Sequence, residues 1–314
     1  METEVDAPAT TRNLSDLAVV RGDGLTPTRW TPHATEPGYL RWITSYVGGR
    51  PGYINNNPET GLISDRTITG LMWLPAGNRQ FGVHIHTVTE IYVILRGHVE
   101  SIEPKGRRHT AGPMDCLYIP KGAPHAVRAV GDEDVLLLWV HDGLELPSAV
   151  RYFEHEDDAP EENAPPVQLI RWDALEPRWT MPGARVGGSL RRAVSWVGGA
   201  PGLVNFNREV GTTSDRLAMG ATIVLPGNSQ PVHTHTVPEH VLVLRGRAEL
   251  TGYPQEATLK PLDFLLAPPG IPHGLRAVGD EPLYLLWIHE ENEPDDTLSP
   301  RSDRGSDSEM EHKQ

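Results

Sequence analysis

The chain has 314 residues, of which 38% are hydrophobic and 22% charged, and its formal net charge is −14. Since a domain commonly holds about 100–200 residues, this length predicts two domains of ordinary size. No stretch approaches the roughly 20 apolar residues that cross a bilayer, and the acidic charge repels phosphate backbones. We therefore expect neither a membrane nor a nucleic acid as a partner.

The ends of the chain and its single cysteine predict a cytoplasmic protein. The first residues lack the basic start and apolar run of a secretory signal, and Cys116 has no second cysteine to pair with. We expect Cys116, in the alternating run DCLYIP, to be a core residue rather than a nucleophile. Residues 1–25 are expected to be a flexible segment, and the acidic, Pro- and Ser-rich residues 154–167 and 291–314 a linker and a disordered tail.

One long repeat divides the rest of the chain. The segment SYVGGRPGYINNN at Ser45 returns 150 residues later as SWVGGAPGLVNFN at Ser195, and the match continues to the end of both copies. A period so far above the roughly 20–50 residues of stacked repeats indicates a duplicated domain. We place the first domain at residues 26–153 and the second at 168–290.

Within each copy the apolar runs are those of short strands. The first copy contains IYVILRG, HVESIE, DCLYIP, AVRAV and VLLLWV, which are rich in β-branched and aromatic residues and are separated by Gly, Pro and Asp turns. No stretch shows a capped 3.6-residue periodicity. The sequence predicts an all-β protein, with two tandem sandwiches or barrels whose interior can hold a ligand.

Each copy also carries three histidines and a glutamate at matching places. His84 and His86 lie two apart on a predicted strand and so point to the same face, Glu90 opens the next strand, and His125 follows a turn. The second copy repeats the set as His233, His235, Glu239 and His273. Three imidazoles and one carboxylate suit a first-row transition metal rather than Ca or Mg. Up to two such ions per chain are expected.

These residues resemble the cupin superfamily. Its first motif is a glycine, five residues, His-x-His, three or four residues, a glutamate, six residues and a glycine. The second copy matches it from Gly227 to Gly246, and the first copy matches it from Gly77 to Gly97 with one extra residue. The resemblance implies two tandem cupin barrels of the double-stranded β-helix, or jelly-roll, type.

The second cupin motif is kept at its centre and changed at its ends. The Pro-x-Gly and histidine are present in both copies, as Pro120 to His125 and Pro268 to His273. The leading glycine is replaced by Met114 and Leu262, and the final asparagine by alanine. These are turn and packing positions, so the metal ligands are expected to be unaffected.

The resemblance implies a metal enzyme and leaves its reaction open. The first hypothesis is a dioxygenase similar to bicupin quercetinases. In it an enolic or phenolic substrate chelates Fe(II), or else Mn, Ni, Co, Cu or Zn, and Glu90 or Glu239 takes the substrate proton. The second is a redox-neutral decarboxylase, lyase, isomerase or cyclase, and the third is a non-catalytic binder of small molecules. Oxalate is disfavoured, because oxalate decarboxylases carry an arginine three residues before the first histidine, where this chain has Phe81 and Gln230.

Other polar residues recur near these motifs. Gln80 and Gln230 precede the first histidine of each set and are candidates to reach a metal-bound molecule. His141 and His289 end strands next to tryptophans, which favours a packing or surface role. Pairing of two barrels within one chain is compatible with a monomer, and a homodimer is the alternative.

Overall fold

The structure is a computed structural model that describes residues 16–25, 36–54, 60, 62–160, 164–210 and 212–291. The chain divides into two compact units: one holds residues 24–175, and the other holds residues 15–23 together with the chain from 176 onward. Helical structure in the described residues is limited to three-residue 3-10 turns, and none of it is long enough to cross a membrane. The predicted all-β class is confirmed.

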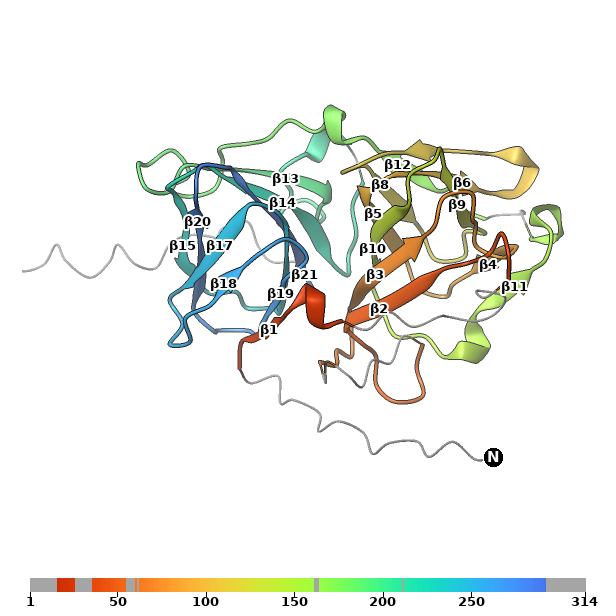
Figure 1. Cartoon of the computed structure of the whole chain (residues 1–314), viewed down its shortest axis with the longest axis horizontal. Coiled ribbons are helices and arrows are strands. Elements are labelled where there is room, and N and C mark those ends of the chain that lie inside the picture. Colours follow the sequence, from red (N-terminus) through yellow and green to blue (C-terminus); the bar gives the residue numbers. More distant parts are fainter. Residues whose placement is uncertain are drawn as a thin grey trace, which may run out of the picture. The chain divides into compact units, whose positions relative to one another are not determined.

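The first unit consists of eleven strands in three sheets. They are β2 Trp42–Val47, β3 Ile68–Leu74, β4 Val83–Ile85, β5 Glu90–Arg96, β6 His98–Ile102, β7 Thr110–Ala111, β8 Cys116–Ile119, β9 Ala126–Val130, β10 Val135–His141, β11 Arg151–Phe153 and β12 Gln168–Ile170, with 3-10 turns at Pro104–Gly106, Pro147–Ala149, Glu156–Asp158 and Trp172–Ala174. The main sheet has the order β12-β8-β5-β10-β3-β2, and the smaller sheets are β7-β6-β9 and β11-β4 (Figure 1). An isolated bridge between His84 and His125 links β4 to the start of β9.

The second unit repeats this plan. Its strands are β1 Ala18–Val20, β13 Arg191–Val197, β14 Ala218–Val224, β15 Ser229–His233, β16 Glu239–Arg245, β17 Arg247–Thr251, β18 Thr258–Leu259, β19 Phe264–Ala267, β20 His273–Val278 and β21 Leu283–His289, with 3-10 turns at Gly22–Gly24 and Arg208–Val210. The main sheet has the order β1-β19-β16-β21-β14-β13, and the second sheet is β15-β20-β17-β18. Each strand of this unit has an equivalent in the first.

The core of each unit is built around its central strand. All seven residues of β10 are buried, because the strand is paired on both edges, with β3 and β5, and covered on both faces. Gly70 of β3 leaves room for the Trp139 ring: a Cβ there would lie 2.0 Å from the Thr44 carbonyl oxygen and 2.3 Å from the indole. Cys116 is fully buried, and burial raises the pKa of its thiol, so its predicted core role is confirmed.

Each main sheet ends in a short edge strand that lies outside the expected bounds of its domain. Residues 18–20, expected in a flexible segment, form β1 on the edge of β19, with Ala18 opposite Leu266. Strand β12, expected to open the second domain, pairs with β8 of the first unit. An exposed sheet edge presents unpaired backbone groups that another strand can bind, and chain order does not decide which strand does so. Residues 1–15, 161–163 and 292–314 of the predicted terminal segments and linker lie outside the described residues.

An aspartate fastens each of these edge strands in the same way. Asp263 accepts hydrogen bonds from the Arg21 guanidinium (2.7 Å) and the Gly22 amide (2.9 Å). Asp115 accepts them from Arg171 (3.0 Å) and the Trp172 amide (2.9 Å). The repeat of these contacts in both units indicates that the pairing is specific.

Met114 and Leu262, which stand where the second cupin motif has a glycine, adopt a backbone conformation that favours glycine. Their φ angles are 71° and 70°, in the left-handed region. Their amides donate hydrogen bonds to Ile94 (2.7 Å) and Val243 (2.9 Å). A non-glycine residue costs about 1–2 kcal/mol in this conformation, so the turn is kept at some loss of stability.

Candidate metal centres

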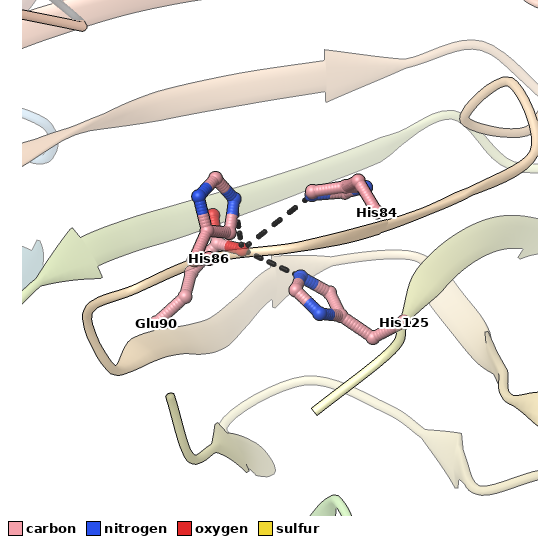
Figure 2. Close-up of side chains that lie close together, drawn as sticks. All are labelled: His84, His86, Glu90 and His125. Atoms are coloured by element: carbon pink, nitrogen blue, oxygen red, sulfur yellow. Dashed lines mark hydrogen bonds and ion pairs between the residues drawn. The ribbon is translucent and has the colours of Figure 1, made fainter. Parts of the chain in front are cut away.

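The four residues predicted for the first site come together inside the first unit. The ligand atoms of His84, His86, Glu90 and His125 all lie within 4.8 Å of one another, and all four residues are buried. The three imidazoles face one oxygen of Glu90 (Figure 2). The Nε2 atoms of His125, His86 and His84 lie 2.8, 3.5 and 3.9 Å from Glu90 Oε2.

Strand pairing explains why these side chains meet. His84 and His125 exchange backbone hydrogen bonds of 2.9 and 3.0 Å, which places one ligand beside the other across two chain segments. His86 lies two residues beyond His84 and therefore projects to the same side. Glu90 is the first residue of β5, reached after a short turn that returns the chain to the same cavity.

The second unit forms the same arrangement. The ligand atoms of His233, His235, Glu239 and His273 also lie within 4.8 Å of one another. Glu239 Oε2 lies 2.7 Å from His273 Nε2 and 3.4 Å from His235 Nε2. His233 is the most accessible of the four, and its Nε2 lies 3.3 Å from the amide nitrogen of Gln230.

The hydrogen bonds on the outer ring nitrogens determine which imidazole atom faces the centre. The Nδ1 atoms of His125, His233 and His273 lie 2.8–2.9 Å from the carbonyl oxygens of the residues two before them. His86 Nδ1 lies 2.5 Å from Glu145 Oε2. Carbonyl and carboxylate oxygens only accept, so in each case Nδ1 carries the hydrogen and Nε2 turns its lone pair towards the glutamate. Such outer partners are typical of metal-binding histidines.

The donor set fits a divalent transition metal. Bonds from such a metal to nitrogen or oxygen are about 2.0–2.2 Å, so neighbouring ligands at right angles lie about 3 Å apart. The nitrogen to oxygen distances of both sites, from 2.7 to 3.9 Å, surround this value. Two lone pairs that face each other inside a buried cavity also call for a cation between them. Three imidazoles and one carboxylate therefore suit such an ion in either unit.

Burial keeps His84 and His233 in the neutral form that binds metal. Desolvation and the neighbouring imidazoles hold the pKa of His84 well below its ordinary value, and the same causes lower the pKa of His233 to about 3. Burial alone would raise the pKa of Glu90, but the surrounding histidines, His141 foremost, hold it well below its ordinary value. Glu239 behaves in the same way. Both carboxylates are therefore anionic at neutral pH.

Two further histidines belong to these sites. His141 lies directly opposite Glu90 in the β10–β5 register, and its Nε2 is 3.1 Å from Glu90 Oε1. His289 lies opposite Glu239, with its Nε2 3.6 Å from Oε1. A surface role for these two residues is wrong, because both are buried against the second oxygen of the carboxylate. The only sequence signal was their recurrence at the end of the same strand.

The first site opens into a small cavity with polar walls. Its volume is about 60 Å3, and its lining includes Arg41, Gln80 and Tyr92. Gln80 accepts a hydrogen bond from the Val127 amide (2.9 Å), and its amide nitrogen lies 3.4 Å from the Tyr92 hydroxyl. Burial and the charge of Glu90 raise the pKa of Tyr92, so this phenol is neutral. Tyr92, two residues after Glu90 on the same face, and Arg41 are site residues that motif spacing did not reveal.

The second site has a more apolar wall. Its cavity, also about 60 Å3, is lined by Val204, Phe206, Thr222 and Trp287 among others. Val241 faces Trp287 in the register where Tyr92 faces Trp139 in the first unit. The hydroxyl of the first site thus has no equivalent at that position.

Comparison with protein families identifies the domain in both units. The family model for the cupin domain matches residues 70–141 and 221–289, which contain the ligand residues of the two sites. The chain belongs to the cupin superfamily. It carries two cupin domains, as the motif resemblance predicts.

Known cupins similar to this chain differ in their reactions. Dimethylsulfoniopropionate lyase DddQ of Ruegeria pomeroyi is 30% identical over 126 residues, which cover 37% of this chain and 62% of that protein. An oxalate decarboxylase variant of Bacillus subtilis matches 92% of this chain and 81% of its own, at 18% identity and a TM-score of 0.56. A salicylate 1,2-dioxygenase variant of Pseudoaminobacter salicylatoxidans in complex with gentisate matches 90% and 84%, at 14% identity and a TM-score of 0.61. The two solved structures show the bicupin fold, and the three proteins are a lyase, a decarboxylase and a dioxygenase.

Proposed function

We propose that the first cupin domain is the catalytic centre of a metal-dependent enzyme that performs a redox-neutral lyase or decarboxylase reaction on a small substrate. The observation that carries this proposal is the small cavity beside the first ligand set, whose wall includes the polar side chains of Arg41, Gln80 and Tyr92. A water-sized group takes about 10–15 Å3 of such a cavity. The 60 Å3 next to His84 and Glu90 therefore holds roughly four to six such groups. A phenolic ring together with O2 needs more room.

The chain's own residues supply the parts that such a reaction requires. His84, His86, Glu90 and His125 would hold the metal, which when bound acts as a Lewis acid towards a substrate oxygen. Glu90 is anionic and is the proposed proton acceptor. The neutral Tyr92 hydroxyl, supported by Gln80, is placed to donate a hydrogen bond to the group that gains negative charge. The lyase activity of the relative that is 30% identical agrees with this class of reaction.

A dioxygenase reaction is the second candidate, and it is favoured in the second domain. There the wall of Val204, Phe206 and Trp287 is apolar, which suits O2 and a small enolic substrate in a cavity of the same volume, with Glu239 as the proton acceptor. Fe(II) is the proposed metal for that chemistry, because O2 activation requires a redox-active ion.

Turnover with and without O2 tests the proposal. The metal-loaded chain would be assayed against small carboxylates and against enolic and phenolic compounds, in air and under argon. We expect conversion of a small substrate at the same rate in both atmospheres, loss of that activity in His84→Ala, and its retention in His233→Ala. Activity that stops under argon would overturn the redox-neutral assignment.

A further inference from the structure

We propose that Arg41 is an anion-binding group in the first domain and that the site takes a small monocarboxylate. This inference rests on the proposed function, because it names the substrate class of the same site. Arg41 immediately precedes β2 and lines the cavity that also contains His84, Glu90 and Tyr92.

The buried Arg41 guanidinium has no hydrogen bond to any residue that the structure describes. The residue is 7% exposed, and Tyr152, Tyr92 and Glu90 act on its charge through space rather than by hydrogen bonds. Burial lowers its pKa, while Tyr152, Tyr92 and Glu90 oppose this effect, and an arginine remains a cation. A buried charge with no partner is costly, so this arrangement favours a ligand that brings the missing anion.

The charges around the cavity also favour an anionic ligand. Glu90 is the one carboxylate among the described residues of this lining, and both of its oxygens already face histidines. Arg41 adds a positive charge, and a divalent ion would add two more. An anionic ligand is therefore favoured, and a guanidinium offers parallel donors that match the two oxygens of a carboxylate.

The rest of the wall favours a carboxylate on a short carbon chain over phosphate. Ile43, Ile54, Met72 and Val150 line the same cavity and would cover aliphatic carbons. Arg41 is the only Lys or Arg among the described residues of this lining, so a second negative charge would meet no further side-chain cation. The volume of about 60 Å3 also suits a ligand of about five heavy atoms.

The repeat provides an internal comparison. Arg191 occupies the equivalent position 150 residues later and lines the second cavity. Its guanidinium donates hydrogen bonds to the carbonyl oxygens of Ser189 (3.0 Å) and Pro182 (2.7 Å), and burial lowers its pKa to about 10. The equivalent arginines thus differ: Arg191 binds backbone carbonyls, whereas Arg41 lines its cavity with no hydrogen bond to a described residue. Neither arginine lies three residues before the first histidine, where Phe81 and Gln230 stand.

Calorimetric titration of the full chain with propionate, propionamide and inorganic phosphate tests the assignment, in the metal-loaded and metal-free protein. We expect saturable propionate binding, with propionamide and phosphate at least about 10-fold weaker. Arg41→Gln and Arg41→Met should weaken propionate binding about 10- to 100-fold and leave propionamide unchanged, because a charged hydrogen-bonded pair is lost. Arg41→Lys, which keeps the charge but not the fork, should fall between them. Arg191→Gln should bind propionate as the wild type does.

Several results would overturn the assignment. Wild-type propionate affinity in the Arg41 variants would show that Arg41 does not bind the ligand. Tighter binding of phosphate than of propionate would show that the site does not prefer a carboxylate. Circular dichroism would show whether each variant is folded, and Arg41→Lys provides the test if the neutral variants do not fold. Arg41-dependent propionate binding without turnover of any carboxylate would contradict only the proposed function. Carboxylate turnover by Arg41→Gln with an unchanged KM would contradict only the Arg41 assignment.

Discussion

The two cupin domains hold the same three histidines and glutamate at matching strand positions, but the walls beside these ligands differ. In the first domain Tyr92 faces the Trp139 strand, and Arg41 lines the cavity without a hydrogen bond to any residue that the structure describes. In the second, Val241 takes the tyrosine position and Arg191 is hydrogen-bonded to backbone carbonyls. The difference indicates that metal binding and substrate recognition can vary separately in this fold, because the candidate ligands are the same in both domains while the side chains beside them differ. Variants made in pairs, one in each domain, can test this separation.

Removal of one ligand from either site should have the largest effect. We expect His84→Ala and His233→Ala each to lower the metal content by about one ion per chain, measured by elemental analysis after dialysis. In each alanine variant a water molecule would have to take the place of the lost imidazole at the metal. A buried site offers that water few hydrogen-bond partners, so the metal is held more weakly. If one variant keeps the full complement, only the other domain is a metal site, and the comparison fails.

Tyr92 of the first domain should affect the rate of the reaction and not the binding of the metal. Tyr92→Phe removes the hydroxyl and keeps the ring, so we expect kcat to fall about 100-fold, the scale of a lost proton-donating group, with unchanged metal content. Val241→Ala is the matched control in the second domain and should leave this activity unchanged. Wild-type kcat in Tyr92→Phe would show that the polar wall has no part in the reaction.

Glu145 should tune the first metal site without taking part in the reaction. It accepts hydrogen bonds from His86 Nδ1 and from the Thr87 hydroxyl (2.7 Å). In Glu145→Gln the amide can donate to Nδ1 and favour the wrong tautomer of His86, so we expect metal affinity to fall about 10-fold. Competition with a chelator would measure this, and the second site serves as the internal reference. Thr87→Ala, which leaves the His86 contact intact, should have a smaller effect, and an equal effect would argue against the tautomer explanation.

The smallest effect is expected at the left-handed turns, and it should be alike in both domains. Met114→Gly and Leu262→Gly relieve a conformation that costs a non-glycine residue about 1–2 kcal/mol, but glycine also gains entropy in the unfolded chain. We expect each change to raise the free energy of unfolding by about 1 kcal/mol or less, measured by denaturant titration. A clear destabilisation would mean that the packing of the half-buried side chain outweighs the strain.

The fold and the grouping of the eight candidate ligands could be predicted because their signals are local. His84 and His86 share a face by strand alternation, and the spacing to Glu90 and Gly97 reproduces a known motif. By strand alternation Tyr92 lies on the same face as Glu90. Within the apolar run IYVILRG, however, the sequence does not distinguish it from a core aromatic. Local patterns thus identify residues that point inward and do not show what those residues do.

The other site residues depend on pairings between distant segments. His141 meets Glu90 because of the β10–β5 register, which links residues 51 positions apart. Arg41 reaches the cavity from before β2, with no spacing rule that relates it to the ligands. The positions of β1 and β12 depend on which of two equivalent sheet edges each strand binds, and the repeat makes both edges similar in sequence.

The edge strands also set an order for folding during synthesis. Arg171 beside β12 reaches Asp115 across 56 positions, whereas Arg21 beside β1 must wait for Asp263, 242 positions later. The first main sheet can therefore be completed while the second is still on the ribosome, and the closure of the longer loop is the last step. A fragment of residues 168–290 would lack β1, the partner of β19, and would separate β12 from its partner β8. Separate expression of the second cupin domain therefore requires residues 16–23 to be joined to it.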